Sequence, residues 1–145
     1  MYNICDMSEK LNLYRPDIDS IFTYVLGQYP NAYNWFLNKV IPELPIKRKI
    51  LGCFVKGKIV AIAILKINDP DEKICTFYVR SKYIRRGIGT ALMTECLKYL
   101  THPYIVVKTS GIFFFRRLLE KFGFELVYKG NLAYRYRLFD HSSEF

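Results

Sequence analysis

The sequence is short of histidine, of closely spaced cysteines and of long apolar runs, and each shortage excludes a class of protein. Its 2 histidines, His102 and His141, and its 4 scattered cysteines have no spacing that suits a metal site, so no metal is expected. The longest apolar run covers residues 59–65, whereas a helix that crosses a bilayer needs about 20 apolar residues. The sequence therefore predicts neither a metalloprotein nor a membrane-spanning protein.

Disulfides are not expected either. No C-x-x-C pair occurs, and Cys53, Cys75 and Cys96 lie in apolar runs, as buried free thiols do. Residues 1–3 lead into a polar stretch without the charged and apolar regions of a secretory signal. Reduced thiols without such a signal favour a cytoplasmic protein.

Acidic residues are outnumbered, because 13 Asp and Glu stand against 22 Lys and Arg, for a formal net charge of +9. Such a balance favours anionic partners, whether coenzyme phosphates, nucleic acid or acidic surfaces. A solvated basic surface is the alternative explanation for most of the lysines. The length of 145 residues suits one domain with its own core, and no repeat, linker or low-complexity segment divides it.

Hydrophobic periodicity predicts the order strand, two helices, three strands, helix, strand, helix, two strands. The helices are expected to begin at Pro16, near Asn31, after Gly87 (running to about residue 100) and at residue 112, with Gly123 ending the last one. The strands are expected over residues 11–15, 50–55, 59–65, 74–79, 104–107, 124–128 and 132–139. Tight turns are predicted at residues 56–58 and 130–131.

One segment carries most of the functional signal: an apolar strand, a basic turn spaced by glycines, and a helix that follows the turn directly. The first N–H groups of a helix have no partner within it and carry the positive end of its dipole. Glycines let a bulky oxyanion approach that backbone closely, and arginines add fixed charge. The segment therefore predicts a phosphate-binding turn; it consists of Phe77-Tyr78-Val79 followed by Arg85-Arg86-Gly87-Ile88-Gly89-Thr90.

Two glycines before a helix also occur in simple tight turns. No Gly-Lys-Ser/Thr follows, which excludes a Walker loop, and position 92 is leucine where a dinucleotide fingerprint has its third glycine. The segment instead resembles the acyl-CoA-binding motif of the GNAT superfamily of N-acetyltransferases, Gln/Arg-x-x-Gly-x-Gly/Ala after an apolar strand. Gly87 and Gly89 match this motif, whereas Ile84 departs from its first position. Residues 119–124, Leu-Glu-Lys-Phe-Gly-Phe, resemble the family's later Tyr-Glu-Lys-Leu-Gly-Phe signature.

The resemblance spans about residues 11–139 and implies a fold, a co-substrate and a binding site. The fold class is α/β, with α+β elements in three layers, and residues 1–145 form one GNAT-like domain. Its sheet is mixed and mainly antiparallel, with a splayed pair of parallel strands and flanking helices. The co-substrate is acetyl-CoA, held largely through backbone groups. Its expected contacts are Phe77, Tyr78, Val79, Arg85, Arg86, Gly87, Ile88, Gly89 and Thr90.

The catalytic groups are marked less clearly. The family's general acid is a tyrosine at the position of Leu119, which lies on an apolar helix face. The catalytic candidates are Ser110, whose alternative role is a helix N-cap, and Tyr134 and Tyr136, whose alternative role is packing. Glu72 lies close to a base position of some relatives but is more typical of a solvated loop carboxylate.

The resemblance implies transfer of an acetyl group to a primary amine of a small molecule, peptide or protein. The sequence leaves open whether the protein is a monomer or a homodimer. A catalytically inactive GNAT-fold protein that binds coenzyme A is one alternative, motivated by Leu119 and Ile84. The others are a toxin-like acetyltransferase acting on aminoacyl-tRNA and a nucleic-acid-binding module, because basic and aromatic residues occur together. The acceptor is expected between the N-terminal helices and the last hairpin, which supply Tyr29, Tyr33, Trp35, Tyr134, Arg135, Tyr136 and Arg137.

Overall fold

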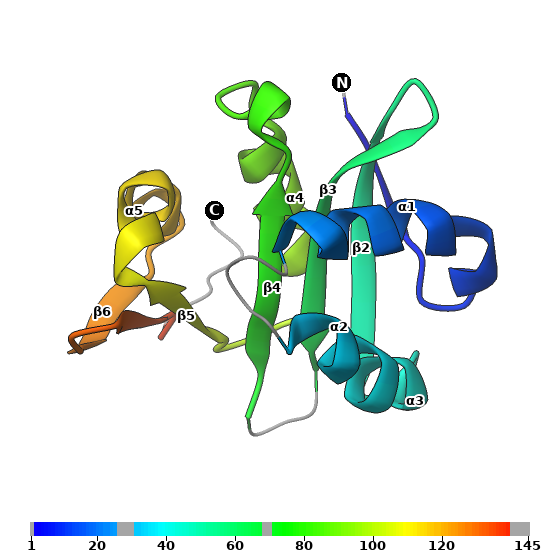
Figure 1. The fold of residues 1–145 in the computed structure, drawn as a ribbon. Coiled ribbons are helices and arrows are strands. Elements are labelled where there is room, and N and C mark those ends of the chain that lie inside the picture. Colours follow the sequence, from blue (N-terminus) through cyan, green and yellow to red (C-terminus); the bar gives the residue numbers. More distant parts are fainter. Residues whose placement is uncertain (1, 26–30, 68–70, 140–145) are drawn as a thin grey trace.

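The computed structural model describes residues 2–25, 31–67 and 71–139. These residues form a three-layer α/β fold in which helices cover both faces of one sheet (Figure 1). The strand order is β1-β2-β3-β4-β5-β7-β6; β4 and β5 pair in parallel and the other neighbours are antiparallel. This confirms the predicted mixed, mainly antiparallel sheet. The strands are β1 (Asn3–Asp6), β2 (Arg48–Val55), β3 (Lys58–Lys66), β4 (Lys73–Val79), β5 (Tyr104–Lys108), β6 (Glu125–Lys129) and β7 (Ala133–Arg137).

Two groups of helices cover the sheet. On one face lie α1 (Leu11–Val25), α2 (Ala32–Trp35), a π-helical turn (Phe36–Val40) and α3 (Ile41–Glu43), which share a core with β2 and β3. On the other face, α4 (Ile88–Cys96) and α5 (Ile112–Lys121) share a second core with β3, β4, β5 and β7. Residues 59–65 of β3 are buried throughout because both cores contact them.

The N-terminal third differs from the prediction. Residues 11–15 are the start of α1 and not a strand, and Pro16 lies inside that helix rather than at its beginning. Leu11 and Tyr14 pack on the same core as the buried Ile18, so the helical spacing of apolar residues begins before the proline. Burial of this face outweighs the backbone hydrogen bond that Pro16 cannot make. The first strand is instead β1, which pairs with β2.

The other predicted elements are present, with shifted ends. At the turn between β2 and β3, Lys56 has φ 52° and Gly57 has φ 78°, the left-handed conformation that a tight two-residue hairpin requires. Helix α4 ends at Cys96, earlier than expected. Strand β6 is the edge strand next to β7, and its residues are exposed.

The parallel pair diverges soon after it begins. Only Lys73 and Ile74 of β4 are paired with β5, opposite Tyr104 and Ile105. Beyond these pairs the two strands separate, as Figure 1 shows. The register of β4 against β3 also shifts between the pairs Leu65↔Ile74 and Ile64↔Thr76, which makes Cys75 the extra residue of a β-bulge. A bulge bends its strand, so β4 bends where it leaves β5.

Glu72 holds the closed end of this strand pair together. Its Oε1 accepts hydrogen bonds from the N–H groups of Thr101 and His102, each at 2.8 Å, and its backbone carbonyl accepts one from Tyr104 at 3.3 Å. The residue is only 8% exposed. It is therefore not a solvated loop carboxylate, because its oxygen is occupied in joining the beginnings of β4 and β5.

Glu72→Ala is expected to lower the free energy of unfolding by about 1–2 kcal/mol, because two amides lose a charged acceptor close to the surface. Glu72→Gln keeps an Oε1 at the same place and should cost less than half as much. Urea unfolding of both variants measures this difference. An equal loss in the two variants would contradict the structural role.

Candidate functional site

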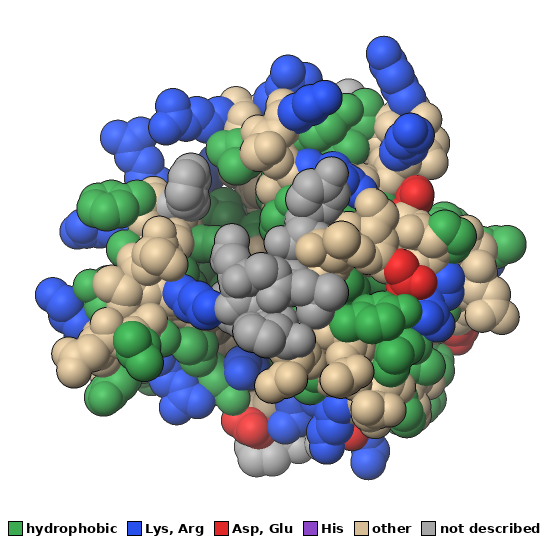
Figure 2. All heavy atoms as spheres, in the orientation of Figure 1, with side chains coloured by type: hydrophobic (Ala, Val, Ile, Leu, Met, Phe, Trp, Pro, Cys, Tyr) green, Lys and Arg blue, Asp and Glu red, His purple; other side chains and the backbone are tan. Residues whose placement is uncertain are grey.

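A cleft of about 1640 Å³ opens where β4 and β5 separate. One end is lined by the turn between β4 and α4 and by α5, and the other by α2 and the ends of β2, β3 and β4. Lysine and arginine side chains spread over the face shown in Figure 2, with far fewer acidic ones. Among the described lining residues none is Asp, Glu or His, and the basic ones are Arg48, Lys66, Lys73, Arg85, Lys108, Arg117 and Lys121.

The turn before α4 presents a row of free backbone donors. Arg85 and Gly87 both have left-handed backbone angles, with φ 67° and 82°, and Gly87 is the N-cap of α4 without a side-chain cap. Across the described chain, no acceptor pairs with the amides of residues 85–90, whereas the next amide, Ala91, donates to the carbonyl of Gly87 at 3.0 Å. Consecutive free amides in such a turn form an anion-binding concavity at the positive end of a helix.

Glycine is suited to the two positions of this turn for different physical reasons. Gly87 needs its left-handed φ, which disfavours a residue with a Cβ. Gly89 is helical, and a Cβ there would contact only the Cδ2 atom of Leu118, at an ordinary 3.7 Å. Internal packing therefore does not require glycine at position 89. Because Gly89 lines the cleft, its missing side chain leaves room for a ligand.

Strand β4 adds donors along the gap. The Arg80 N–H donates to the carbonyl of Val60 at 2.8 Å, and hydrogen-bonded pairs alternate along an antiparallel ladder. Tyr78 therefore faces β3 with its backbone groups, opposite Ile62. The amides of Phe77 and Val79 point the other way, into the gap that β5 leaves open.

Most residues predicted for the coenzyme line this one cleft. The exceptions are Arg86 and Ile88. The Arg86 guanidinium lies 5.4 Å from the Tyr83 ring centroid, and the Arg86 carbonyl accepts a hydrogen bond from the Tyr2 hydroxyl at 2.7 Å. Ile88 is buried in the core. The lining residues are Phe77, Tyr78, Val79, Arg85, Gly87, Gly89 and Thr90. The prediction missed α5, from which Arg117 and Lys121 line the same end. Their spacing of four residues on one helix face was the available signal.

The three catalytic candidates are not together. Ser110 is exposed and lines the cleft, and it is not the N-cap of α5, which is Gly111. Tyr134 and Tyr136 pack against the α4–α5 core and do not line the described cleft. Burial raises the pKa of Tyr136 above its ordinary value. Leu119 has an exposure of 0% in the same core.

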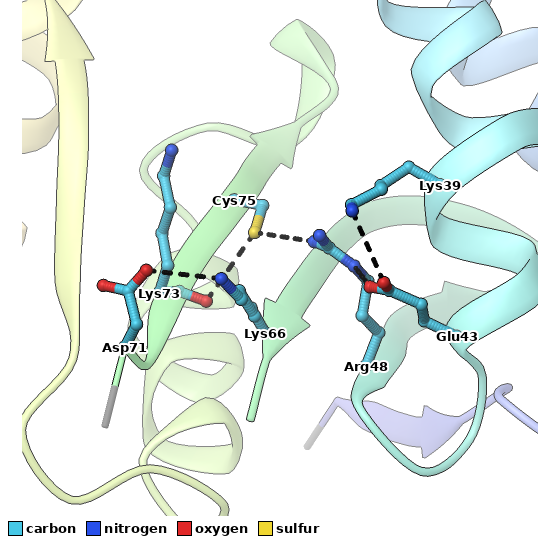
Figure 3. A network of polar contacts seen from close by, with 7 residues as sticks. All are labelled: Lys39, Glu43, Arg48, Lys66, Asp71, Lys73 and Cys75. Atoms are coloured by element: carbon cyan, nitrogen blue, oxygen red, sulfur yellow. Dashed lines mark hydrogen bonds and ion pairs between the residues drawn. The ribbon is translucent and has the colours of Figure 1, made fainter. Parts of the chain in front are cut away.

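The end of the cleft away from the turn contains a second polar group that the sequence did not indicate (Figure 3). The Arg48 side chain is 5% exposed; its Nε donates to Glu43 at 2.7 Å, and its Nη1 lies 3.3 Å from the Sγ of Cys75. The Arg48 guanidinium also lies 5.6 Å from the Trp35 ring centroid. Burial raises the pKa of the Cys75 thiol although nearby cations oppose this, so the thiol stays neutral. Tyr29, predicted for this region, lies outside the described residues.

Residues 2–25, 31–67 and 71–139 contain no group of three or more His, Cys, Asp or Glu side chains able to hold a metal ion. None of their helices has the length and apolar character needed to cross a membrane. All four cysteines are free thiols, Cys53 and Cys96 being buried.

Comparisons with known proteins agree with this geometry. Residues 15–124 match the family model of the Acetyltransferase (GNAT) family, while no curated protein matches the sequence. Among solved structures, the PaiA N-acetyltransferase from Thermoplasma acidophilum, in complex with coenzyme A, is similar with a TM-score of 0.69 and 18% identity, over 94% of this chain and 98% of that chain.

Two other solved structures are similar. A GNAT family acetyltransferase from Elizabethkingia anophelis with acetyl-CoA bound has a TM-score of 0.55 and 15% identity, over 70% of this chain and 82% of that chain. Ard1 from Thermoplasma volcanium has a TM-score of 0.65 and 19% identity, over 94% of this chain and 95% of that chain. These likenesses show a shared fold. Because the family model matches most of the chain, this protein belongs to the GNAT family of acetyltransferases.

Proposed function

We propose that this protein transfers the acetyl group of acetyl-CoA to a primary amine of a small molecule, peptide or protein. The row of free amides at residues 85–90, beside the open gap between β4 and β5, is the observation that carries this proposal. A cytoplasmic location also remains a prediction, in keeping with the free thiols.

The turn suits the pyrophosphate of coenzyme A. Its amides would donate hydrogen bonds to the phosphate oxygens, and Arg85 and Lys121 line the same end of the cleft with positive charge. The Lys121 Nζ lies 3.4 Å from the Thr90 hydroxyl, which places this ammonium beside the first turn of α4. The complexes of the two structural neighbours with coenzyme A and acetyl-CoA support the same assignment.

Acetyl-CoA supplies the acetyl group as a reactive thioester. The amides of Phe77 and Val79 would donate to a carbonyl oxygen in the gap and so stabilise the negative charge that develops on it. The cationic lining has two further effects. Positive charges disfavour the protonated form of a bound amine and favour a leaving thiolate. The amine proton can therefore pass to water in the open cleft before the amine attacks, without a carboxylate base in the described lining.

Ser110 is our choice for holding a water or donating a proton near the leaving group, because its hydroxyl lines the cleft. Ser110→Ala is expected to lower kcat about tenfold, less than the roughly 10²–10⁴-fold loss of a full general acid, with unchanged coenzyme affinity. Tyr134→Phe and Tyr136→Phe should retain turnover. A large loss of kcat in either tyrosine variant would move the assignment to the hairpin.

The proposal is tested by calorimetry with acetyl-CoA and then by thiol release over a panel of amines. Saturable binding with amine-dependent thiol release supports it. Binding without turnover of any amine would favour the catalytically inactive alternative. If acetyl-CoA does not bind at all, the nucleic-acid-binding module becomes the better hypothesis.

A further inference from the structure

Three basic residues lie side by side at the end of the cleft away from the glycine turn. Arg48 of β2 is directly opposite Lys66 of β3, and Lys66 is directly opposite Lys73 of β4. All three line the cleft, and we call them the basic row. Like charges directly opposite in a sheet are destabilising, so the row costs stability to the extent that its charges are not neutralised.

The basic row is distinct from the predicted coenzyme site. Lys73 begins β4 and Val79 ends it, and at about 3.3 Å per residue these positions are roughly 20 Å apart. The glycine turn follows Val79. The pyrophosphate and the basic row therefore occupy opposite ends of the cleft, and the position of the thioester, beside Phe77, lies between them.

The charges of the row are only partly neutralised. Glu43 pairs with Arg48 at 2.7 Å, and the pKa of Glu43 is lowered by this hydrogen bond, so the carboxylate is charged. Lys66 pairs at 3.3 Å with Asp71, whose side chain is 56% exposed, a weak pair in water. Lys73 has no acidic partner in the described structure and lies 5.5 Å from the Tyr104 ring centroid.

Arg48 presents a donor without a good acceptor. Its Nε is occupied by Glu43, its Nη1 contacts the neutral thiol of Cys75, and no described atom accepts from its Nη2. A thiol is a weak hydrogen-bond acceptor. A carboxylate can accept two parallel hydrogen bonds from a guanidinium, so an anionic oxygen in the cleft would be a better acceptor for the Arg48 Nη atoms than the thiol.

We propose that the acceptor is a primary amine that also carries a carboxylate, and that the basic row binds this carboxylate while the amine faces the thioester. This proposal rests on the proposed acetyltransferase function. The Arg48 guanidinium reaches Cys75, which is two residues from Phe77. A carboxylate bound by Arg48 there lies about 7 Å along β4 from the amine. Polyamines and other polycationic acceptors are repelled by the same row.

Matched acceptors that differ only in charge test the proposal. The thiol-release assay compares 4-aminobutyrate with its neutral amide, and a peptide that begins with glutamate with the same peptide beginning with glutamine. In the preferred pair, we expect kcat/KM to be at least about tenfold higher for the carboxylate compound than for its amide, mainly because KM is lower. A preference for 4-aminobutyrate over its amide indicates that the acceptor is a free amino acid. A preference for the glutamate peptide over the glutamine peptide indicates an acidic peptide.

Variants assign this preference to the basic row. In Lys66→Gln/Lys73→Gln the carboxylate-to-amide ratio should fall severalfold, to the part that Arg48 alone maintains, and Lys73→Glu should lower it as well. Lys58→Gln, at the exposed start of β3 and away from the cleft, is the matched control and should keep the ratio. Equal rates for carboxylate and amide, or a ratio unchanged in the double variant, would overturn the proposal. So would acetylation of aminoacyl-tRNA without acetylation of the carboxylate acceptors.

A binding experiment separates this proposal from the proposed function. If no amine is acetylated, the acetyltransferase function fails, and 4-aminobutyrate is then titrated by calorimetry into protein saturated with coenzyme A. Binding that exceeds that of the amide and is weakened in Lys66→Gln/Lys73→Gln supports the basic row as an anion site. Equal or absent binding of the two compounds refutes it.

Discussion

Gly87→Val is expected to weaken coenzyme A binding at least tenfold, and up to about a hundredfold, because the turn loses the conformation that aligns its amides. A β-branched residue is strongly disfavoured at φ 82°. Relief of this strain moves the backbone out of the left-handed region and turns the free donors of residues 85–90 away from one another. Leaving such donors without their anion costs about 1–3 kcal/mol. Calorimetry with coenzyme A measures the change.

Gly57→Val provides a control with matched strain. Gly57 has φ 78°, close to the value at Gly87, and a Cβ at either position would meet no atom within 4 Å. Both variants should therefore lose similar stability in thermal unfolding. Only Gly87→Val should lose coenzyme affinity, since Gly57 lies in the β2–β3 turn. Unchanged affinity in Gly87→Val would remove the turn from the binding site.

Leu119→Tyr is expected to destabilise the protein without raising its turnover. Leu119, at the position where the sequence resemblance predicts the family's tyrosine, has 0% exposure in the core. A tyrosine would overpack this core and bury a hydroxyl without a partner, at a cost of about 2–4 kcal/mol. The melting temperature should fall by about 6–12 °C. Calorimetric unfolding and the thiol-release assay together measure both effects.

Leu119→Met is the volume-conserving control and should cost less than about 1.5 kcal/mol. A rise in kcat for Leu119→Tyr, with a melting temperature near that of the unsubstituted protein, would contradict this expectation. It would show that position 119 reaches the cleft and that the chain has simply lost an acid. The expected result instead leaves proton transfer to Ser110, water and the cationic lining.

Features set by local backbone chemistry could be predicted from the sequence. The β2–β3 turn and the glycine turn each require residues that tolerate positive φ, and glycine marks both positions. The strands that flank them are apolar over most of their length. A short range of residues was therefore enough to place the strand, the turn and α4 in order.

Features that arise from residues far apart in the chain could not be predicted from the sequence. Arg48, Lys66 and Lys73 are separated along the chain and become neighbours only through the registers of β2, β3 and β4. The bulge at Cys75 likewise depends on how β4 pairs with β3. Glu72 looked like a loop residue because its partners, Thr101 and His102, are about thirty positions away. Pairing register is a tertiary property, and periodicity does not reveal it.

The placement of Trp35 gives the protein an intrinsic optical reporter. It is the 1 tryptophan of the sequence, it lines the cleft, and its ring lies 5.6 Å from the Arg48 guanidinium. A carboxylate that draws Arg48 towards it changes the polarity and charge next to the indole. Tryptophan emission, excited where tyrosine does not absorb, should therefore shift when an acceptor occupies the basic row. Coenzyme A, which we propose binds at the far end of β4, should leave that emission nearly unchanged, so the two ligands can be titrated separately without any label.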